Sequence, residues 1–235
     1  MKMNENTVLI TGGATGIGYS IAKFFYKRGN TIIICGRRED RLALVEKELQ
    51  GIHTFKCDVA NPEGRIALFK YVSENFPKVN ILVNNAGIQR DIDLTQGLDE
   101  LDSGDSEIRI NFEAPVYLSG LFTPALFHKE NATIINVSSG LAFMVDKASR
   151  CPVYCATKAG LHAFSIAQRI QLAPLGIRVV EIIPPMVESE LNMEGRKKRG
   201  TLKSPFMMTS DEYVEKTFAK MEEGMEEIRL QRVES

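Results

Sequence analysis

Residues 7–18 read TVLITGGATGIG and join a short apolar run to a turn rich in glycine. The run Thr7–Thr11 predicts a buried strand, and a helical pattern follows over residues 17–28. Glycine is required in such a turn wherever a Cβ would block a positive φ or the close approach of a phosphate. The helix start offers free N–H groups and a positive dipole end to a pyrophosphate. The place of this turn, on the first strand–helix connection, favours a dinucleotide site over an ordinary tight turn, with contacts expected at Gly12, Thr15, Gly16, Ile17 and Gly18.

Short β-branched runs alternate with longer amphipathic segments along the chain. This alternation predicts βαβ units, and strands that are apolar throughout are typical of parallel sheets buried on both faces. We therefore expect an α/β fold, a Rossmann-type doubly wound parallel sheet of about seven strands with helices on both faces, in one domain over residues 1–235. The expected strands are Thr7–Thr11, Thr31–Cys35, Ile52–Cys57, Asn80–Val83, Ala132–Ser138, Ile177–Ile182 and a weak Glu227–Leu230. The expected helices cover residues 17–28, 39–50, 62–76, 105–128, 154–173 and 210–223.

The 235 residues carry a formal net charge of −1, and 44% of them are hydrophobic. A balance this close to neutral gives no electrostatic reason to expect nucleic acid or an anionic membrane surface as a partner. The N-terminus has no apolar stretch long enough for a signal peptide, and no apolar run reaches the ~20 residues of a membrane helix. We therefore expect a cytoplasmic protein.

The four cysteines and three histidines show no metal-binding pattern. Cys151 and Cys155 lie four residues apart, without a third ligand beside them to complete a zinc set. All four cysteines are interpreted as plain apolar residues. His53, His128 and His162 are interpreted as structural, so no metal site is expected.

The end of the second expected strand bears on the choice between NAD and NADP. An acidic residue there would bond the ribose 2′-hydroxyl, whereas an arginine accommodates a 2′-phosphate. The chain has Gly36 at that place, followed by Arg37 and Arg38. Arginine suits a phosphate because its guanidinium is planar and forked. The pattern favours NADP over NAD and over the alternative of surface arginines that open the next helix.

Tyr154 and Lys158 lie four residues apart at the start of a predicted helix. Residues at this spacing share one helix face, with Cβ atoms about 5–6 Å apart. A lysine ammonium at that distance favours the phenolate and lowers the pKa of the tyrosine from its ordinary value near 10. A tyrosine tuned in this way can exchange a proton near neutral pH. We expect both residues in the catalytic set and in contact with the cofactor.

The motif T-G-x-x-x-G-x-G at Thr11–Gly18, with Y-x-x-x-K at Tyr154–Lys158, resembles the short, single-domain branch of the short-chain dehydrogenase/reductase family over about residues 6–190. The resemblance implies an oxidoreductase that interconverts a carbonyl and an alcohol with NADPH, and a small-molecule substrate. It also implies a homodimer or homotetramer built through the helices that follow strands four and five. Candidates for that interface, or for the core instead, are Phe112, Leu118, Phe122 and Phe164.

The same resemblance assigns the remaining site residues. It places the catalytic serine at Ser139, with Ser138 as the fallback, and an asparagine that holds a water at Asn111. A proline, Pro185, stands where the family has glycine, and proline removes a backbone N–H there. Further cofactor contacts are implied at Asp58, Val59, Asn85, Ala86, Gly87, Pro184 and Val187.

In the implied reaction, hydride passes from the nicotinamide to a carbonyl carbon while Tyr154 delivers the proton. Ser139 and Tyr154 hold the carbonyl oxygen, and Lys158 contacts the nicotinamide ribose.

A different possibility is a non-catalytic NADP-sensing protein on the same fold, and a third is an isomerase or dehydratase. Residues 188–204, with their basic run, are expected to be a solvated loop or a substrate lid. The Pro184-Pro185 pair, together with a late helix at Asp211–Met225, looks similar to a bacterial subgroup associated with teichoic-acid D-alanylation operons.

Overall fold

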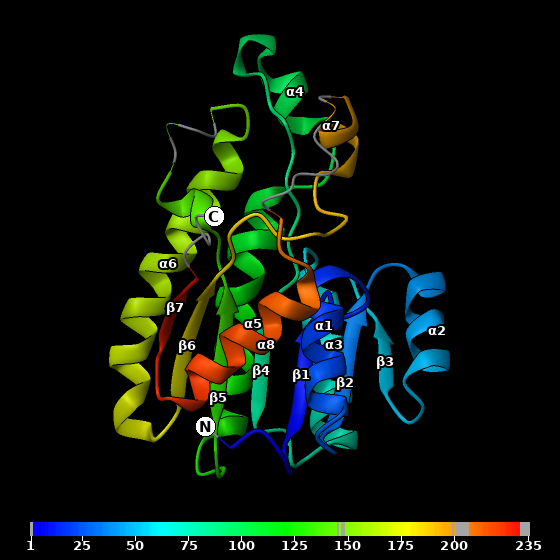
Figure 1. Ribbon diagram of the computed structural model, residues 1–235, viewed down its shortest axis with the longest axis vertical. Coiled ribbons are helices and arrows are strands. Elements are labelled where there is room, and N and C mark those ends of the chain that lie inside the picture. The colour runs from blue at the N-terminus through cyan, green and yellow to red at the C-terminus, as the bar shows by residue number, and fades with distance from the viewer. Residues whose placement is uncertain (1, 145, 147–148, 199, 201–206, 231–235) are drawn as a thin grey trace.

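The computed structural model describes residues 2–144, 146, 149–198, 200 and 207–230 (Figure 1). Its centre is one parallel sheet with the strand order β3-β2-β1-β4-β5-β6-β7. Each strand lies within one residue of the expected bounds, which confirms the predicted fold class. The strands are β1 (Thr7–Thr11), β2 (Thr31–Gly36), β3 (His53–Lys56), β4 (Ile81–Asn84), β5 (Thr133–Val137), β6 (Arg178–Ile183) and β7 (Glu227–Arg229).

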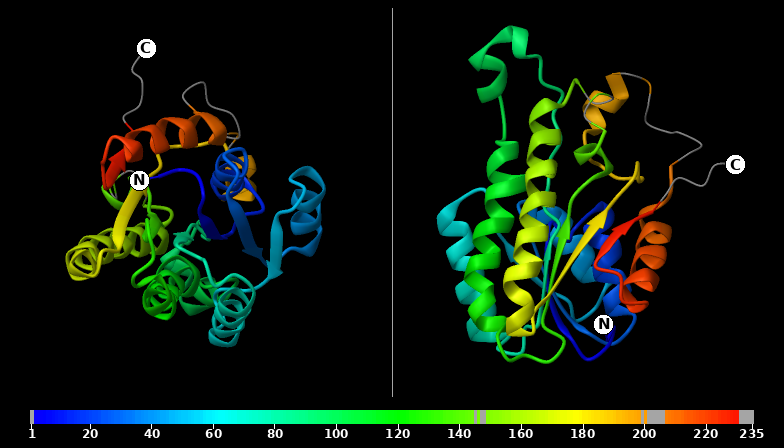
Figure 2. Two further views of the ribbon diagram at one scale, coloured as in Figure 1. Left: turned by 90° about the horizontal axis from the view of Figure 1, so that it is seen from below. Right: turned by 90° about the vertical axis from the view of Figure 1, so that its left-hand side faces the viewer.

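Helices cover both faces of the sheet, as Figure 2 shows in the view from below. Helices α1 and α2 pack with α8 on one face, and α3 and α5 pack with α6 on the other. The bounds are α1 (Gly16–Tyr26), α2 (Glu39–Glu48), α3 (Pro62–Asn75), α4 (Leu98–Asp102), α5 (Ala114–Leu126), α6 (Pro152–Leu172), α7 (Met193–Lys198) and α8 (Ser210–Glu222). No helix in the part of the chain that the structure describes is long and apolar enough to cross a membrane.

The alternation of side chains along each strand divides the core into two layers. On β6, Val179 faces the core layer beneath α5, while Val180 and Ile182 face the layer beneath α1 and α8. Of the residues proposed for either core or interface, Leu118 and Phe122 are fully buried in the core. Burial of these apolar chains is the main term that stabilises the sheet and its two helical layers.

The helix expected over residues 105–128 is interrupted. Residues 105 and 106 are not helical, and Arg109–Glu113 form a turn of π-helix, η2, before α5 begins. Pro115 has no N–H to donate to the carbonyl of Asn111, so the regular α-helical ladder cannot pass through that point. π-Turns of this kind recur at functional sites, and here the turn carries Asn111.

The strand order changes direction between β1 and β4, because β2 and β3 lie on one side of β1 while β4 to β7 lie on the other. In open α/β sheets, ligands bind in the crevice at the carboxyl ends of the strands beside such a reversal. Figure 1 shows α4 and α7 above that same edge of the sheet. The topology therefore places the mouth of a ligand site between the glycine turn and the loops that follow β4, β5 and β6.

Candidate functional site

The glycine turn connects β1 to α1 and is closely packed. Gly12 and Gly16 have positive φ values of 64° and 55°, which side chains rarely tolerate. A Cβ on Gly18 would lie 2.3 Å from both the Gly12 carbonyl oxygen and Asn85 Nδ2, so nothing larger than glycine fits. No side chain caps the first turn of α1, because Thr15 at the N-cap makes no such hydrogen bond. The free N–H groups of α1 therefore remain available to an anion.

Hydrogen bonds join the glycine turn to the loop after β4. The backbone N–H groups of Asn85 and Ala86 each donate to Thr11 Oγ1 at 3.0 Å. Asn85 Nδ2 donates to the carbonyls of Thr11 and Gly12 at 2.9 and 3.1 Å. These bonds span the point where the strand order reverses and fix one wall of the crevice.

The two arginines after β2 reach the mouth of the crevice and are engaged in ion pairs. Arg37 contacts Asp105 at 2.6 Å, in the segment between α4 and η2. Arg38 contacts Glu190 at 2.9 Å and also donates to Thr15 Oγ1 at 3.3 Å, beside the glycine turn. Both guanidiniums are about half exposed and therefore accessible to a phosphate.

Tyr154 and Lys158 lie on the buried face of α6, and each is 4% exposed. Lys158 Nζ donates to the carbonyl of Val137 at the end of β5, at 2.8 Å. Its nitrogen is 5.8 Å from the centre of the Tyr154 ring. Ser139 follows β5 directly, and its Oγ accepts the N–H of Leu141 at 3.1 Å. The end of β5 and the first turns of α6 thus bring the three side chains to one wall.

Ser138 and Ser139 differ in their surroundings. Ser139 is close enough to Tyr154 to hydrogen-bond its hydroxyl. Ser138 Oγ is buried without a hydrogen-bond partner among the residues that the structure describes. The geometry favours Ser139 over the fallback position.

Asn111 lies behind this wall and is fully buried on η2. Its side chain bonds both backbone groups of Ile88, at 2.9 and 2.8 Å, and also donates to Thr157 Oγ1 at 3.2 Å. A Cβ on Gly87 would lie 3.4 Å from Asn111 Oδ1 and 3.5 Å from Lys158 Nζ. The asparagine and the lysine therefore converge on Gly87.

Burial controls the charge states in this group. Removal of the Tyr154 phenol from water raises its pKa to about 12, and the hydrogen bond from Ser139 offsets only part of that effect. The expected lowering of the Tyr154 pKa is thus wrong for this structure, because burial outweighs the groups that favour the phenolate. Burial also lowers the pKa of Lys158 to about 8, against the charge of Glu181, which raises it. At neutral pH, Tyr154 therefore keeps its phenolic proton and Lys158 is largely charged.

These elements line one cavity of about 780 Å³ that runs from the glycine turn to Tyr154. Every residue expected to contact the cofactor lines it, as do Ser139, Tyr154 and Lys158, whereas Asn111 lies behind the lining. The free helix start, the close-packed glycines and the two arginines fit a nicotinamide dinucleotide with a phosphorylated ribose. Lining residues that the motifs do not indicate include Gln89, Leu141, Met144, Arg150 and Glu190.

The segment over residues 188–204, expected to be a loop or lid, contains the short helix α7 as far as the described residues extend. It is joined to the opposite side of the mouth, because Asn192 Nδ2 donates to Asp91 Oδ1 at 2.9 Å. The Glu190 pairing with Arg38 forms a second such connection.

Comparison with known proteins agrees with this geometry. Residues 6–200 match the family model of the short chain dehydrogenases. The chain is 48% identical to the oxidoreductase DltE of Bacillus subtilis, with all of this chain and 91% of that protein aligned. It is 30% identical to an oxidoreductase of Staphylococcus saprophyticus over 82% of each protein.

Among solved structures, a short-chain dehydrogenase from Sphingobium yanoikuyae in complex with NADPH superimposes with a TM-score of 0.82. That comparison has 25% sequence identity and covers 94% of this chain and 86% of the other. Proteins of this family bind nicotinamide cofactors and act as oxidoreductases. With its seven-stranded sheet and its full-length match to DltE, the chain belongs to the short-chain dehydrogenase family and, within it, to the DltE-like subgroup.

Proposed function

We propose that this protein is an NADP-dependent oxidoreductase that reduces a carbonyl compound to an alcohol, or catalyses the reverse reaction. The observation that carries the proposal is the shared wall on which Ser139, Tyr154 and Lys158 meet, in one cavity with the free N-terminus of α1. NADPH, when bound in this cavity, supplies the hydride that the substrate carbon accepts. The protein's own part is to orient the substrate and to supply the proton.

In this proposal, Tyr154 donates its phenolic proton to the substrate oxygen. Its raised pKa keeps the proton in place until negative charge develops on that oxygen. Ser139 donates a second hydrogen bond to the same oxygen, so both donors are in position before the reaction begins. Lys158 supports Tyr154 through its positive charge, while Asn111 holds a water on the route by which Tyr154 regains a proton.

The proposal extends to the surroundings of the site. The expected substrate lid over residues 188–204 is described only at residues 188–198 and 200, and the contact between Asn192 and Asp91 across the mouth supports a lid in that part. Homo-oligomers form through the outer faces of α5 and α6, where large apolar side chains are exposed. Those side chains are Tyr117, Ile166 and Ile170.

The direct test is oxidation of NADPH, followed by the absorbance of the reduced nicotinamide, against a panel of ketones and aldehydes. Turnover of at least one carbonyl compound supports the proposal. Binding of NADPH without turnover of any compound supports the alternative, a cofactor-sensing protein.

The rate of carbonyl reduction should fall as pH rises through about 8. Because the pKa of Lys158 is lowered to about 8, the lysine is charged below that pH and neutral above it. Tyr154 stays protonated across this range, since its pKa is raised to about 12. We expect kcat/KM for reduction to decrease about tenfold per pH unit above the midpoint, measured from initial rates.

The variant Lys158→Arg carries a charge that does not titrate in proteins. If Lys158 is the titrating group, the decrease in kcat/KM moves to higher pH in this variant or disappears. A wild-type profile that stays flat from pH 6 to about 10 would contradict the proposed part of Lys158.

Loss of the Arg38 guanidinium should weaken NADPH binding far more than NADH binding. Arg38 lines the cavity beside the glycine turn, where a 2′-phosphate would meet it. A hydrogen bond to a charged group contributes about 1.5–3 kcal/mol, so Arg38→Ala should raise Kd for NADPH roughly 10- to 100-fold. Isothermal titration calorimetry with both cofactors measures this ratio.

Arg41→Ala is the matched control for that experiment. Arg41 pairs with the same Glu190 carboxylate, at 2.9 Å, but does not line the cavity. Its loss should leave the preference for NADPH unchanged. Equal weakening of NADPH and NADH in Arg38→Ala would mean that the arginine does not contact the 2′-phosphate.

A further inference from the structure

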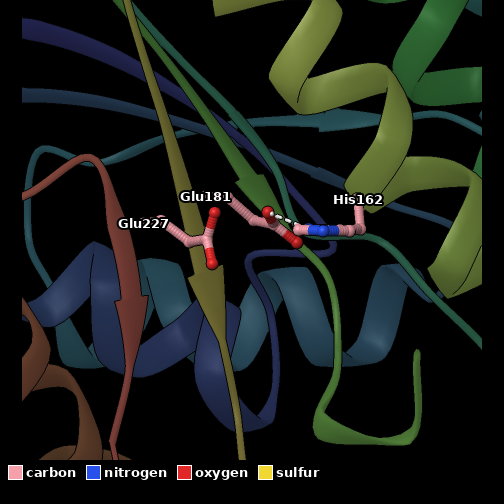
Figure 3. A group of neighbouring side chains, drawn as sticks. All are labelled: His162, Glu181 and Glu227. Atoms are coloured by element: carbon pink, nitrogen blue, oxygen red, sulfur yellow. Dashed lines mark hydrogen bonds and ion pairs between the residues drawn. The ribbon is translucent and has the colours of Figure 1, made fainter. Parts of the chain in front are cut away.

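Three side chains from three elements meet at the β7 edge of the sheet, apart from the cofactor cavity. His162 comes from α6, Glu181 from β6 and Glu227 from β7. One potential ligand atom of each lies within 4.8 Å of the others. No other set of three His, Cys, Asp or Glu side chains comes this close in the described part of the chain. Figure 3 shows the Glu181 carboxylate between the Glu227 carboxylate and the His162 ring.

The sheet register forces the two carboxylates together. Glu181 and Glu227 are direct partners in the parallel pairing of β6 with β7, and both point to the face that α6 covers. The next pair along, Ile182 and Ile228, points to the opposite face and is buried there. Like charges placed directly opposite on adjacent strands destabilise a sheet, so this arrangement needs a positive charge between them.

Glu181 is fully buried and only half satisfied. Its Oε2 atom lies 2.8 Å from His162 Nδ1. Its Oε1 atom has no hydrogen-bond partner among the described residues. A buried carboxylate oxygen without a partner is costly and rare in native structures. The orphaned oxygen lies in a cluster with a second carboxylate and an imidazole, an arrangement that a cation would stabilise.

The nearby basic side chains are engaged elsewhere. Arg169 and Arg178 both contact Glu226. The guanidinium of Arg229 lies 4.9 Å from the centre of the Phe143 ring. Lys158, whose pKa the charge of Glu181 raises, donates its hydrogen bond to Val137. None of these contacts satisfies Glu181 Oε1.

We propose that His162, Glu181 and Glu227 bind a divalent cation of the zinc type. One imidazole nitrogen and two carboxylate oxygens form a donor set that zinc accepts, whereas calcium and magnesium prefer oxygen ligands alone. Ligands at about 2.1 Å from one ion lie roughly 3.0–3.4 Å apart. The 2.8 Å His162–Glu181 pair would open by a few tenths of an ångström, and the exposed Glu227 carboxylate would move closer from its place within 4.8 Å. A histidine binds a metal ion as a neutral imidazole, so Nδ1 would act as the ligand and Nε2 would carry the ring proton.

The accessibility of the cluster suits a metal site. Glu227 is exposed and His162 is 22% exposed, so an ion can enter from solvent and keep a water as its fourth ligand. The bound ion would join the three-residue edge strand β7 to β6 and α6. This inference does not depend on the proposed reductase activity.

The test uses full-length protein without a histidine tag, freed of metal with a chelator and titrated with Zn²⁺ by calorimetry. We expect one site per chain, and at least tenfold weaker binding in Glu227→Gln and in His162→Gln. Both substitutions spare the buried carboxylate, so the fold is retained. Glu222→Gln, which removes another exposed carboxylate outside the cluster, should bind Zn²⁺ as the wild type does.

Thermal unfolding with added metal ions and the absorption spectrum of the Co²⁺ form test whether the ion binds at this cluster. Zn²⁺ should raise the Tm of the wild type and of Glu222→Gln but not of Glu227→Gln, while Mg²⁺ should raise none of them. Co²⁺ substituted for Zn²⁺ should show no thiolate charge-transfer band, since the site holds no cysteine. The proposal is overturned if the wild type does not bind Zn²⁺, if both cluster variants bind Zn²⁺ as tightly as the wild type, or if a thiolate band appears.

Discussion

Tyr154→Phe should lower the rate of carbonyl reduction by about 10³-fold or more while NADPH still binds. The substitution removes only the phenolic hydroxyl, which is the group proposed to deliver the proton. General acid catalysis by a positioned side chain contributes about 10²–10⁴-fold, and the expected loss falls within that range. Stopped-flow absorbance gives the rate of reduction, and calorimetry gives the affinity for NADPH.

The structure explains why binding should survive this change. Tyr154 is 4% exposed and packs with Cys151 and Cys155, and phenylalanine fills the same volume. The ring therefore stays in place, and Lys158 keeps its bond to Val137. Should Tyr154→Phe retain more than a tenth of wild-type turnover, Tyr154 is not the proton donor.

Gly18→Ala should weaken dinucleotide binding by about 10²-fold or more. The added Cβ would lie 2.3 Å from the Gly12 carbonyl oxygen, and backbone at that distance must shift. It would also lie 2.3 Å from Asn85 Nδ2, which bonds the glycine turn to the β4 loop. A shift of the turn moves the N–H groups of α1 away from the cofactor phosphates, and each charge-assisted hydrogen bond lost costs about 1.5–3 kcal/mol. Calorimetric titration with NADPH measures the change.

Gly120→Ala is the matched control for this prediction. Gly120 lies inside α5 with open space around its Cβ position and an ordinary φ. Alanine is favoured over glycine in a helix by up to about 1 kcal/mol, so this variant should bind NADPH normally and unfold at a slightly higher temperature. If the two variants bind NADPH equally well, the proposed phosphate site is misplaced. Circular dichroism verifies that both variants are folded.

Local sequence patterns were sufficient to predict the sheet and much of the candidate site. Apolar runs bounded by turns gave each strand within one residue, because a strand buried on both faces needs apolar side chains throughout. The glycine spacing and the four-residue interval from Tyr154 to Lys158 are local signals as well. They place the residues in one cavity once the order of the elements is known.

Features that depend on contacts between distant segments could not be predicted in this way. The raised pKa of Tyr154 follows from how deeply α6 is buried, which the interval of four residues does not indicate. The hydrogen bonds of Asn111 to both backbone groups of Ile88 join residues that lie 23 positions apart in the chain. The pairing of Glu181 with Glu227 depends on the register of two strands that are far apart in the sequence.

If Arg38 binds a cofactor phosphate as proposed, its ion pair with Glu190 makes cofactor entry an exchange of anions. A dinucleotide phosphate that reaches Arg38 must displace the Glu190 carboxylate, which also neutralises Arg41. The guanidinium therefore does not pass through an unpaired state, and the displaced carboxylate belongs to the segment that leads into α7. Binding of the phosphate at Arg38 would thus be coupled to the position of the segment that leads into α7. Added salt should weaken both ion pairs of Arg38, the one with Glu190 and the one with the phosphate, to a similar extent.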